Sequence, residues 1–185
     1  MLLDALKNYF WQNEPANVRF VANGMMISTE SETDFWQSIH HNIHKDNGHF
    51  FYTEKKSDFT MLTKWHFKDS VASDQCGLMI RVDSLNWAKI SFLTTDLQKP
   101  QIGSVVSVAG TSDWSIWPLQ EIPSNIWFKV SRKGKDFSFS FSIDGFNFIQ
   151  TRVFSIPLAS DKIKSGAYAC SPQKHSFECI LEEIF

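Results

Sequence analysis

The sequence predicts an all-β protein in which two antiparallel sheets pack face to face as a sandwich. Apolar residues alternate with small or charged ones through the segment Phe137-Ser138-Phe139-Ser140-Phe141-Ser142-Ile143-Asp144, which is the period of a strand with one buried face. Similar segments recur between turn residues, and a helical stripe is present at most in residues 2–9. Many short strands joined by short turns are typical of a two-sheet sandwich.

Each strand is predicted from its periodicity and from the turn residues that bound it. The pair Asp144-Gly145 predicts a hairpin from the Phe137 segment into residues 146–149. The turn 133–135 predicts the preceding hairpin, whose first strand is 126–131, so these strands form a meander. The segment 112–118 is expected to be a loop. The other predicted strands are 25–29, 34–43, 49–53, 59–67, 76–82, 87–94, 105–109, 167–170 and 176–181.

Length and composition favour one domain over residues 1–185. A chain of 185 residues usually forms a single core, and 43% hydrophobic and 15% aromatic residues supply enough apolar surface to bury. The net charge is −2 and no basic block is present, which argues against a nucleic-acid partner. The sequence does not define an oligomeric state.

The chain is expected to be cytoplasmic and to lack a membrane span. Its first seven residues do not combine a basic start with an apolar stretch, and nowhere do 18 uncharged apolar residues run together. The three cysteines are an odd number without paired spacing, which suits a reducing compartment better than a disulfide framework. They are Cys76, Cys170 and Cys179.

The seven tryptophans suggest aromatic platforms for a sugar. Trp36 and Trp87 each alternate with polar residues, which places both rings on polar faces, where a ligand or only solvent could meet them. Trp65 shares its face with apolar residues and is expected in the core. Trp114 and its neighbour Asp113 lie in the loop-like segment and are included as ligand candidates, although Trp114 could instead cap the core.

Polar side chains on two consecutive predicted strands give a candidate binding face. A groove on the outer face of a curved sheet would let a ring stack while charges bind hydroxyl groups. Arg81 could hold a ligand or pair with a neighbouring residue. His49 follows a turn and could be an acid, a base, a hydrogen-bond donor or a structural residue. The set on the two strands is Asp74, Gln75, Arg81, Trp87 and Lys89.

No metal, cofactor or catalytic carboxylate pair is predicted. His40 and His44 would share a helical face, but in a strand they are roughly 13 Å apart, too far for one ion. The segment 32–37 resembles the Glu-x-Asp-x-x-Glu signature of concanavalin A-like glucanases, yet Gln37 stands at its last position and cannot donate a proton. Binding is therefore favoured over catalysis.

Seven blocks occur in an order that resembles one known family over nearly the whole chain. They are Thr33-Asp34-Phe35-Trp36-Gln37, Asp46-Asn47-Gly48-His49-Phe50, Asp74-Gln75-Cys76-Gly77-Leu78-Met79-Ile80-Arg81, Trp87-Ala88-Lys89, Ser112-Asp113-Trp114-Ser115, Ser142-Ile143-Asp144-Gly145 and Ala169-Cys170-Ser171-Pro172. The family is a domain-of-unknown-function group of concanavalin A-like proteins that includes YesU-like proteins and fungal regulation-of-enolase proteins. The resemblance implies a concanavalin A-like jelly-roll β-sandwich.

Three hypotheses for function follow. The first is a carbohydrate-binding or carbohydrate-metabolism accessory protein that uses the concave face of the sandwich. The second, implied by the resemblance, is a regulatory protein whose partner is a metabolic enzyme such as enolase. The third is a glycan-processing enzyme with His49 and either Asp74 or Asp113 as acid and base. The candidate ligand-binding residues are Trp36, His49, Gln75, Arg81, Trp87, Lys89, Asp113 and Trp114.

Overall fold

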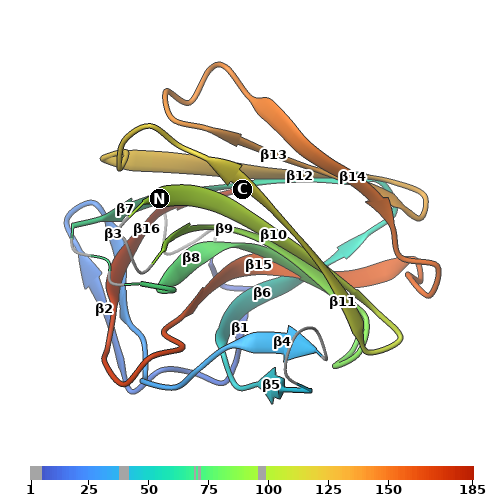
Figure 1. Ribbon diagram of the computed structural model, residues 1–185. Coiled ribbons are helices and arrows are strands. Elements are labelled where there is room, and N and C mark those ends of the chain that lie inside the picture. Colours follow the sequence, from blue (N-terminus) through green and yellow to red (C-terminus); the bar gives the residue numbers. More distant parts are fainter. Residues whose placement is uncertain (1–5, 38–41, 69, 71, 96–98) are drawn as a thin grey trace.

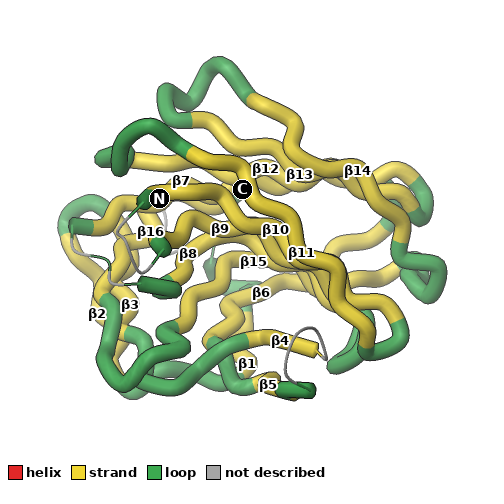
Figure 2. The backbone as a smooth tube through the Cα atoms, in the orientation of Figure 1, coloured by secondary structure: helices red, strands yellow, loops and turns green. Residues whose placement is uncertain are grey.

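The computed structural model is a sandwich of two antiparallel sheets with a small hairpin on one outer face (Figure 1). It describes residues 6–37, 42–68, 70, 72–95 and 99–185. Sixteen strands are present in these residues, and Figure 2 shows the chain between them as loops and turns. No helix in the described part of the chain is long and apolar enough to cross a membrane.

Each of the two large sheets has seven strands. Sheet A has the order β1 (Phe10–Gln12), β6 (His49–Lys56), β15 (Lys162–Cys170), β8 (Gln75–Arg81), β9 (Trp87–Thr94), β10 (Pro100–Val108) and β11 (Thr111–Pro118). Sheet B has the order β14 (Ile149–Ser155), β13 (Asp136–Ser142), β12 (Asn125–Lys133), β7 (Phe59–Phe67), β16 (Glu178–Ile184), β3 (Gly24–Ser28) and β2 (Asn17–Val21). The hairpin consists of β4 (Phe35–Gln37) and β5 (His44–Asp46).

The main core fills the space between the sheets, as the alternating pattern predicts. The phenylalanines at positions 137, 139 and 141 of β13 are all at most 2% exposed, and Trp65 is fully buried as expected. The three cysteines are free and buried. Burial raises the pKa of the Cys76 thiol well above its usual range, so this side chain is a neutral core residue.

The predicted hairpin after Asp144 forms, but its second strand begins only at Ile149. The Asp144 carboxylate accepts hydrogen bonds from the backbone N–H groups of Asn147 and Phe146, each at 2.8 Å, and these bonds hold its pKa below the usual range. They keep residues 146–148 in the turn. Phe146 is apolar, which suggested a strand residue, but it is an exposed residue of the turn.

The segment 112–118 was expected to be a loop and is instead most of the edge strand β11. It pairs with β10 along its whole length, from Gln101 opposite Pro118 to Val108 opposite Thr111. The sequence concealed this strand because an edge strand has hydrogen-bonding neighbours on one side and side chains that stay largely exposed on both faces. Without a buried face, the strand has no clear alternation.

A second apolar cluster lies on the outer face of sheet A, away from the main core. Strand β4 covers it, because Phe35 is fully buried with its ring centroid 6.4 Å from the rings of both Trp87 and Tyr168. Figure 1 shows sheet A arching over the β4–β5 hairpin. The outer face of this sheet therefore has one covered half and one open half.

The close approach of β8 to β9 requires a glycine at position 77. A Cβ atom there would lie 2.0 Å from the carbonyl oxygen of Ile90, a backbone atom. We expect Gly77→Ala to lower the free energy of unfolding by about 2 kcal/mol or more, measured by urea denaturation. Gly103→Ala is the matched control, because its nearest atom, at 2.5 Å, is the flexible Leu93 Cδ2. Equal losses in the two variants would contradict the backbone contact.

Candidate functional site

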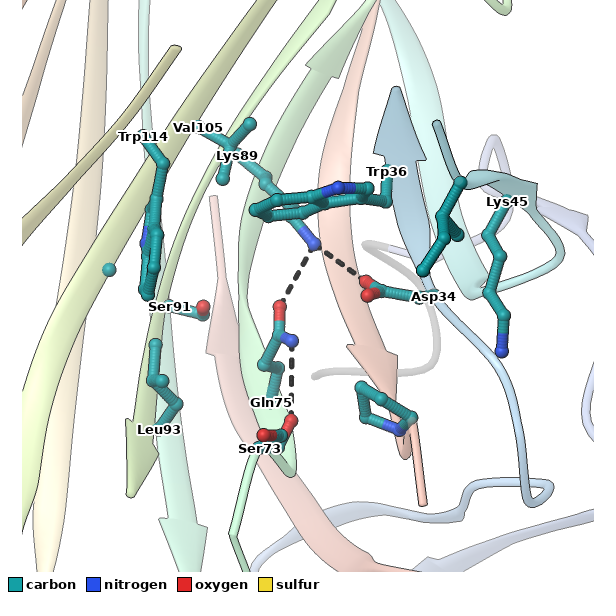
Figure 3. Close-up of a pocket in the computed structure, with 13 residues that line it drawn as sticks. Asp34, Trp36, Lys45, Ser73, Gln75, Lys89, Ser91, Leu93, Val105 and Trp114 are labelled. Carbon is teal, nitrogen blue, oxygen red and sulfur yellow. Dashed lines mark hydrogen bonds and ion pairs between the residues drawn. The ribbon is translucent and has the colours of Figure 1, made fainter. Parts of the chain in front are cut away.

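A pocket with a volume of about 340 Å³ opens on the uncovered half of the outer face of sheet A. Strands β8, β9 and β10 form its floor, the β4–β5 segment forms one wall, and β11 forms the opposite wall (Figure 3). The lining residues are Asp34, Trp36, Ile43, Lys45, Ser73, Gln75, Lys89, Ser91, Leu93, Gly103, Val105, Trp114 and Pro172.

A buried cation lies at the centre of the floor. The Lys89 residue is only 2% exposed, and its Nζ donates to Asp34 Oδ1 at 2.8 Å and to Gln75 Oε1 at 2.9 Å. The side chain of Asp34 is 13% exposed, so the pair is largely removed from water. A buried charge of this kind needs its partner, because an uncompensated ion in the interior is strongly destabilising.

Two neutral donors bind the same two acceptor residues that Lys89 binds, Gln75 and Asp34. The Tyr168 hydroxyl lies 3.1 Å from Gln75 Oε1, and Cys170 Sγ lies 3.6 Å from Asp34 Oδ1. Burial is the largest cause that raises the pKa of both groups well above their usual ranges. The phenol and the thiol therefore keep their protons and donate to the acceptors that also bind Lys89.

Two indole rings line the pocket and contact each other edge to face. Trp36 comes from β4 and Trp114 from β11, and their ring centroids are 6.0 Å apart with an interplanar angle of 76°. Figure 3 shows the Trp36 ring next to the Lys89 ammonium group and the Trp114 ring further to the left. Trp114 is 43% exposed, whereas Trp36 is partly buried. The two rings give a ligand perpendicular apolar surfaces next to a polar floor.

The structure brings four of the eight predicted ligand-binding residues to the pocket. These four are Trp36, Gln75, Lys89 and Trp114. The other four lie outside its lining.

The prediction that the Trp87 ring lies open on a polar face is wrong. Trp87 does lie on the same side of β9 as Lys89, but its exposed fraction is 0% because Phe35 packs over it. Its indole N–H donates to the carbonyl of Ser84 at 3.2 Å. Trp87 therefore lies under Phe35 and outside the lining of the pocket.

Arg81 and Asp113 both form ion pairs away from the pocket. The Arg81 guanidinium binds both carboxylate oxygens of Asp46, at 2.6 and 2.7 Å, so its partner lies in β5. Asp113 pairs with Arg152 across the edge of the sandwich. Both residues connect elements of the fold, which was the alternative left open for Arg81.

His49 and Asp74 lie within separate hydrogen-bonded clusters. His49 is 1% exposed. Its Nε2 accepts from the backbone N–H of Glu30 at 3.0 Å, which leaves the Nδ1 proton for the carbonyl of Asn13 at 2.7 Å. Asp74 lies 2.5 Å from Ser171 Oγ and 2.7 Å from His175 Nε2. Neither His49 nor Asp74 lines the pocket.

The near match to a glucanase signature has a structural explanation. Gln37 donates to the carbonyl of Ser84 at 3.2 Å, and its Oε1 lies 2.7 Å from His44 Nδ1, so it fixes the β4–β5 hairpin. His40 and His41 lie outside the described residues. No group of three or more candidate metal ligands occurs in the described part of the chain.

Sequence reasoning missed Asp34 as a site residue and Asp46 as the partner of Arg81. One available signal was the position of Lys89 within a strand of otherwise uncharged residues. A lysine at such a position requires a carboxylate nearby. The sequence could not show which acidic residue supplies it, because Asp34 is 55 residues away along the chain.

Solved structures similar to this one define its class. The fold matches GH43 BlXynB from Bacillus licheniformis with a TM-score of 0.72 and 13% identity, over 96% of this chain and 38% of that one. It also matches the CBM2 module of the evolved Dit of Lactobacillus casei BL23 phage J-1, with a TM-score of 0.61 and 8% identity, over 96% and 91% of the two chains. These identities show the fold alone. The protein is a concanavalin A-like jelly-roll β-sandwich, as the resemblance implied.

The chain belongs to the family described as protein of unknown function DUF1349, which matches residues 11–184. It is 27% identical over 173 residues to Regulation of enolase protein 1 of Saccharomyces cerevisiae, covering 94% of this chain and 86% of that protein. A crystal structure of a functionally unknown protein from Saccharomyces cerevisiae matches with a TM-score of 0.90 and 27% identity, over 97% and 96% of the chains. The family resemblance seen in the sequence is confirmed.

The buried pair predicts strong coupling between Lys89 and Asp34. We expect Lys89→Met to lower the free energy of unfolding by about 3 kcal/mol, because it leaves the carboxylate without its cation. The double variant Lys89→Met with Asp34→Asn should lose at least about 1 kcal/mol less than the sum of the single losses. Urea denaturation of all four proteins measures the coupling. Additive losses would show that the ion pair contributes nothing specific.

Proposed function

We propose that this protein binds a carbohydrate in the pocket lined by Trp36 and Trp114. One observation carries the proposal: two indole rings from different elements face a small pocket whose floor holds the Lys89, Asp34 and Gln75 network. Apolar walls with a few fixed polar groups are typical of small-molecule sites. The free, buried cysteines support a cytoplasmic location for this activity.

Sugars match this combination of surfaces. A pyranose ring has an apolar C–H face that packs on an indole and a rim of hydroxyl groups that donate and accept hydrogen bonds. An ammonium group has three N–H donors, and Lys89 uses two of them for Asp34 and Gln75. Because Lys89 lines the pocket, we assign its remaining donor to a ligand oxygen. The polar groups are already fixed by one another, so binding does not require them to become ordered.

The same geometry favours binding over hydrolysis. Glycoside hydrolysis uses two carboxyl groups about 5 to 9.5 Å apart. Among the described residues that line the pocket, Asp34 is the single acidic residue, and it is held by Lys89. The acid and base suggested by the sequence, His49 with Asp74 or Asp113, lie outside the lining and have partners elsewhere.

Removal of either pocket indole should weaken sugar binding. We expect Trp36→Ala and Trp114→Ala to weaken it at least tenfold, about 1.4 kcal/mol, because each loses a stacking surface. The measurement is calorimetric titration with β-1,4-linked oligosaccharides of xylose, glucose and mannose, after a glycan-array screen. Trp117→Ala is the matched control, because Trp117 is also 43% exposed on β11 but contacts Phe141 and lies outside the lining. An equal loss in the control, or no binding by any sugar, would contradict the proposal.

A second candidate function is regulation of a metabolic enzyme through direct contact. The observation that favours it is the 27% identity to a yeast protein named for the regulation of enolase. The test is biosensor binding of purified enolase to the immobilised protein, with the Trp36→Ala variant as a comparison. Saturable binding that survives this substitution would support an interface distinct from the pocket. The absence of binding would leave the sugar-binding function as the better supported one.

A further inference from the structure

We infer that the pocket takes the end of a saccharide chain, one or two sugar units long, and does not accept an internal segment of a long chain. The inference rests on the proposed function and specifies its ligand class. Its basis is the β4–β5 hairpin, which closes one side of what would otherwise be a groove across the outer face of sheet A.

An open groove on this face would cross neighbouring strands from β11 towards β6. The floor of the pocket does cross β10, β9 and β8. Beyond it, the next outward residues are Met79 on β8, Tyr168 on β15 and Phe50 on β6, and each is at most 1% exposed. Phe35 of β4 packs in the same cluster as these side chains. A saccharide chain that lay across the floor of the pocket would therefore be blocked by the β4–β5 hairpin and could not extend over β15 and β6.

Several contacts hold the hairpin in this closing position. Asp46 of β5 binds the buried Arg81 of β8, and Gln37 of β4 binds the carbonyl of Ser84. Asp34, which precedes β4, binds the buried Lys89 of β9. Two of these contacts are ion pairs whose cations are at most 5% exposed. Separation of the hairpin from the sheet would leave both cations without their carboxylates, so the wall is a fixed part of the site.

The other boundaries of the pocket also limit its length. Trp114 stands on the β11 side, and Pro172 and Ser73 line the pocket as well. Space near Trp114 is tight, since a Cβ atom at Gly103 would lie 3.3 Å from the indole Nε1 and 2.5 Å from Leu93 Cδ2. The volume of about 340 Å³ is near the lower end of the range for small-molecule sites. These dimensions match a terminal unit and its neighbour.

Lys89 comes from β9, the middle strand of the floor, and its ammonium group reaches Asp34 in the wall that the hairpin forms. Its Nζ lies between Asp34 of the wall and Gln75 of the floor. The ammonium is also 5.9 Å from the ring centroid of the covered Trp87. Because Lys89 lines the pocket, we assign its remaining donor to a ligand group that reaches this wall. A terminal unit brings hydroxyl groups that an internal unit has used in glycosidic linkages, which makes this donor selective for an end.

The test compares chain lengths within each sugar series of the binding panel. For β-1,4-linked xylose, glucose and mannose, the monosaccharide, disaccharide and hexasaccharide are titrated into the wild-type protein. We expect affinity to rise from one to two units and to change less than threefold from two to six. A rise of tenfold or more from two to six units would overturn the chain-end inference while leaving sugar binding intact. Absence of binding in every series would instead overturn the proposed function.

A second measurement tests directly whether binding depends on the number of saccharide chain ends. Equal masses of the matching soluble polysaccharide, before and after partial endo-hydrolysis, compete with the disaccharide for the protein. We expect the hydrolysed sample to compete more strongly, in proportion to its number of chain ends. Equal competition by both samples would show that internal segments bind and would overturn the inference.

Discussion

The ion pair between Lys89 and Asp34 is the interaction on which the rest of the site depends. A buried, charged lysine in the middle of sheet A would strongly destabilise the fold without a carboxylate beside it. That carboxylate is Asp34, in the segment that leads into β4. The pair therefore fixes the hairpin on the sheet at the same time as it makes the polar floor of the pocket. Gln75 and Tyr168 extend the network beneath it, which gives each buried polar group a partner.

The hairpin divides the outer face of sheet A into two regions with different chemistry. On one side, Phe35 covers Trp87 and Tyr168 to form a small apolar core outside the sandwich. On the other side, the face holds the pocket that Trp36 and Trp114 line. The covered region holds the hairpin firmly on the sheet, and the open region forms the candidate binding pocket. A jelly-roll scaffold supports many functions, so the site, rather than the fold, carries the functional argument.

Much of the fold could be predicted because most strands have one buried face. The bounds predicted for the strands 59–67 and 87–94 are those observed for β7 and β9. Prediction failed where a strand lies at an edge, as in β11, or where side-chain hydrogen bonds hold apolar residues in a turn, as after Asp144. Part of the candidate site followed from alternation, since Gln75 and Lys89 were placed on the outer face of neighbouring strands. The partners of Lys89 and Arg81 did not follow, because they are distant in sequence.

The sequence by itself determined the all-β class, the sandwich, the family and the set of side chains that face away from the main core, because period-two alternation is a local property. Only the tertiary structure decided which of those side chains meet a ligand. The outward position of Trp87 is encoded in β9, but its burial depends on Phe35, which lies 52 residues earlier in the chain. Phe35 belongs to a hairpin that long-range ion pairs and the Gln37–Ser84 hydrogen bond hold on the sheet. The solvent exposure of a side chain depends on which residues pack over it, and the local alternation of the sequence does not show which residues those are.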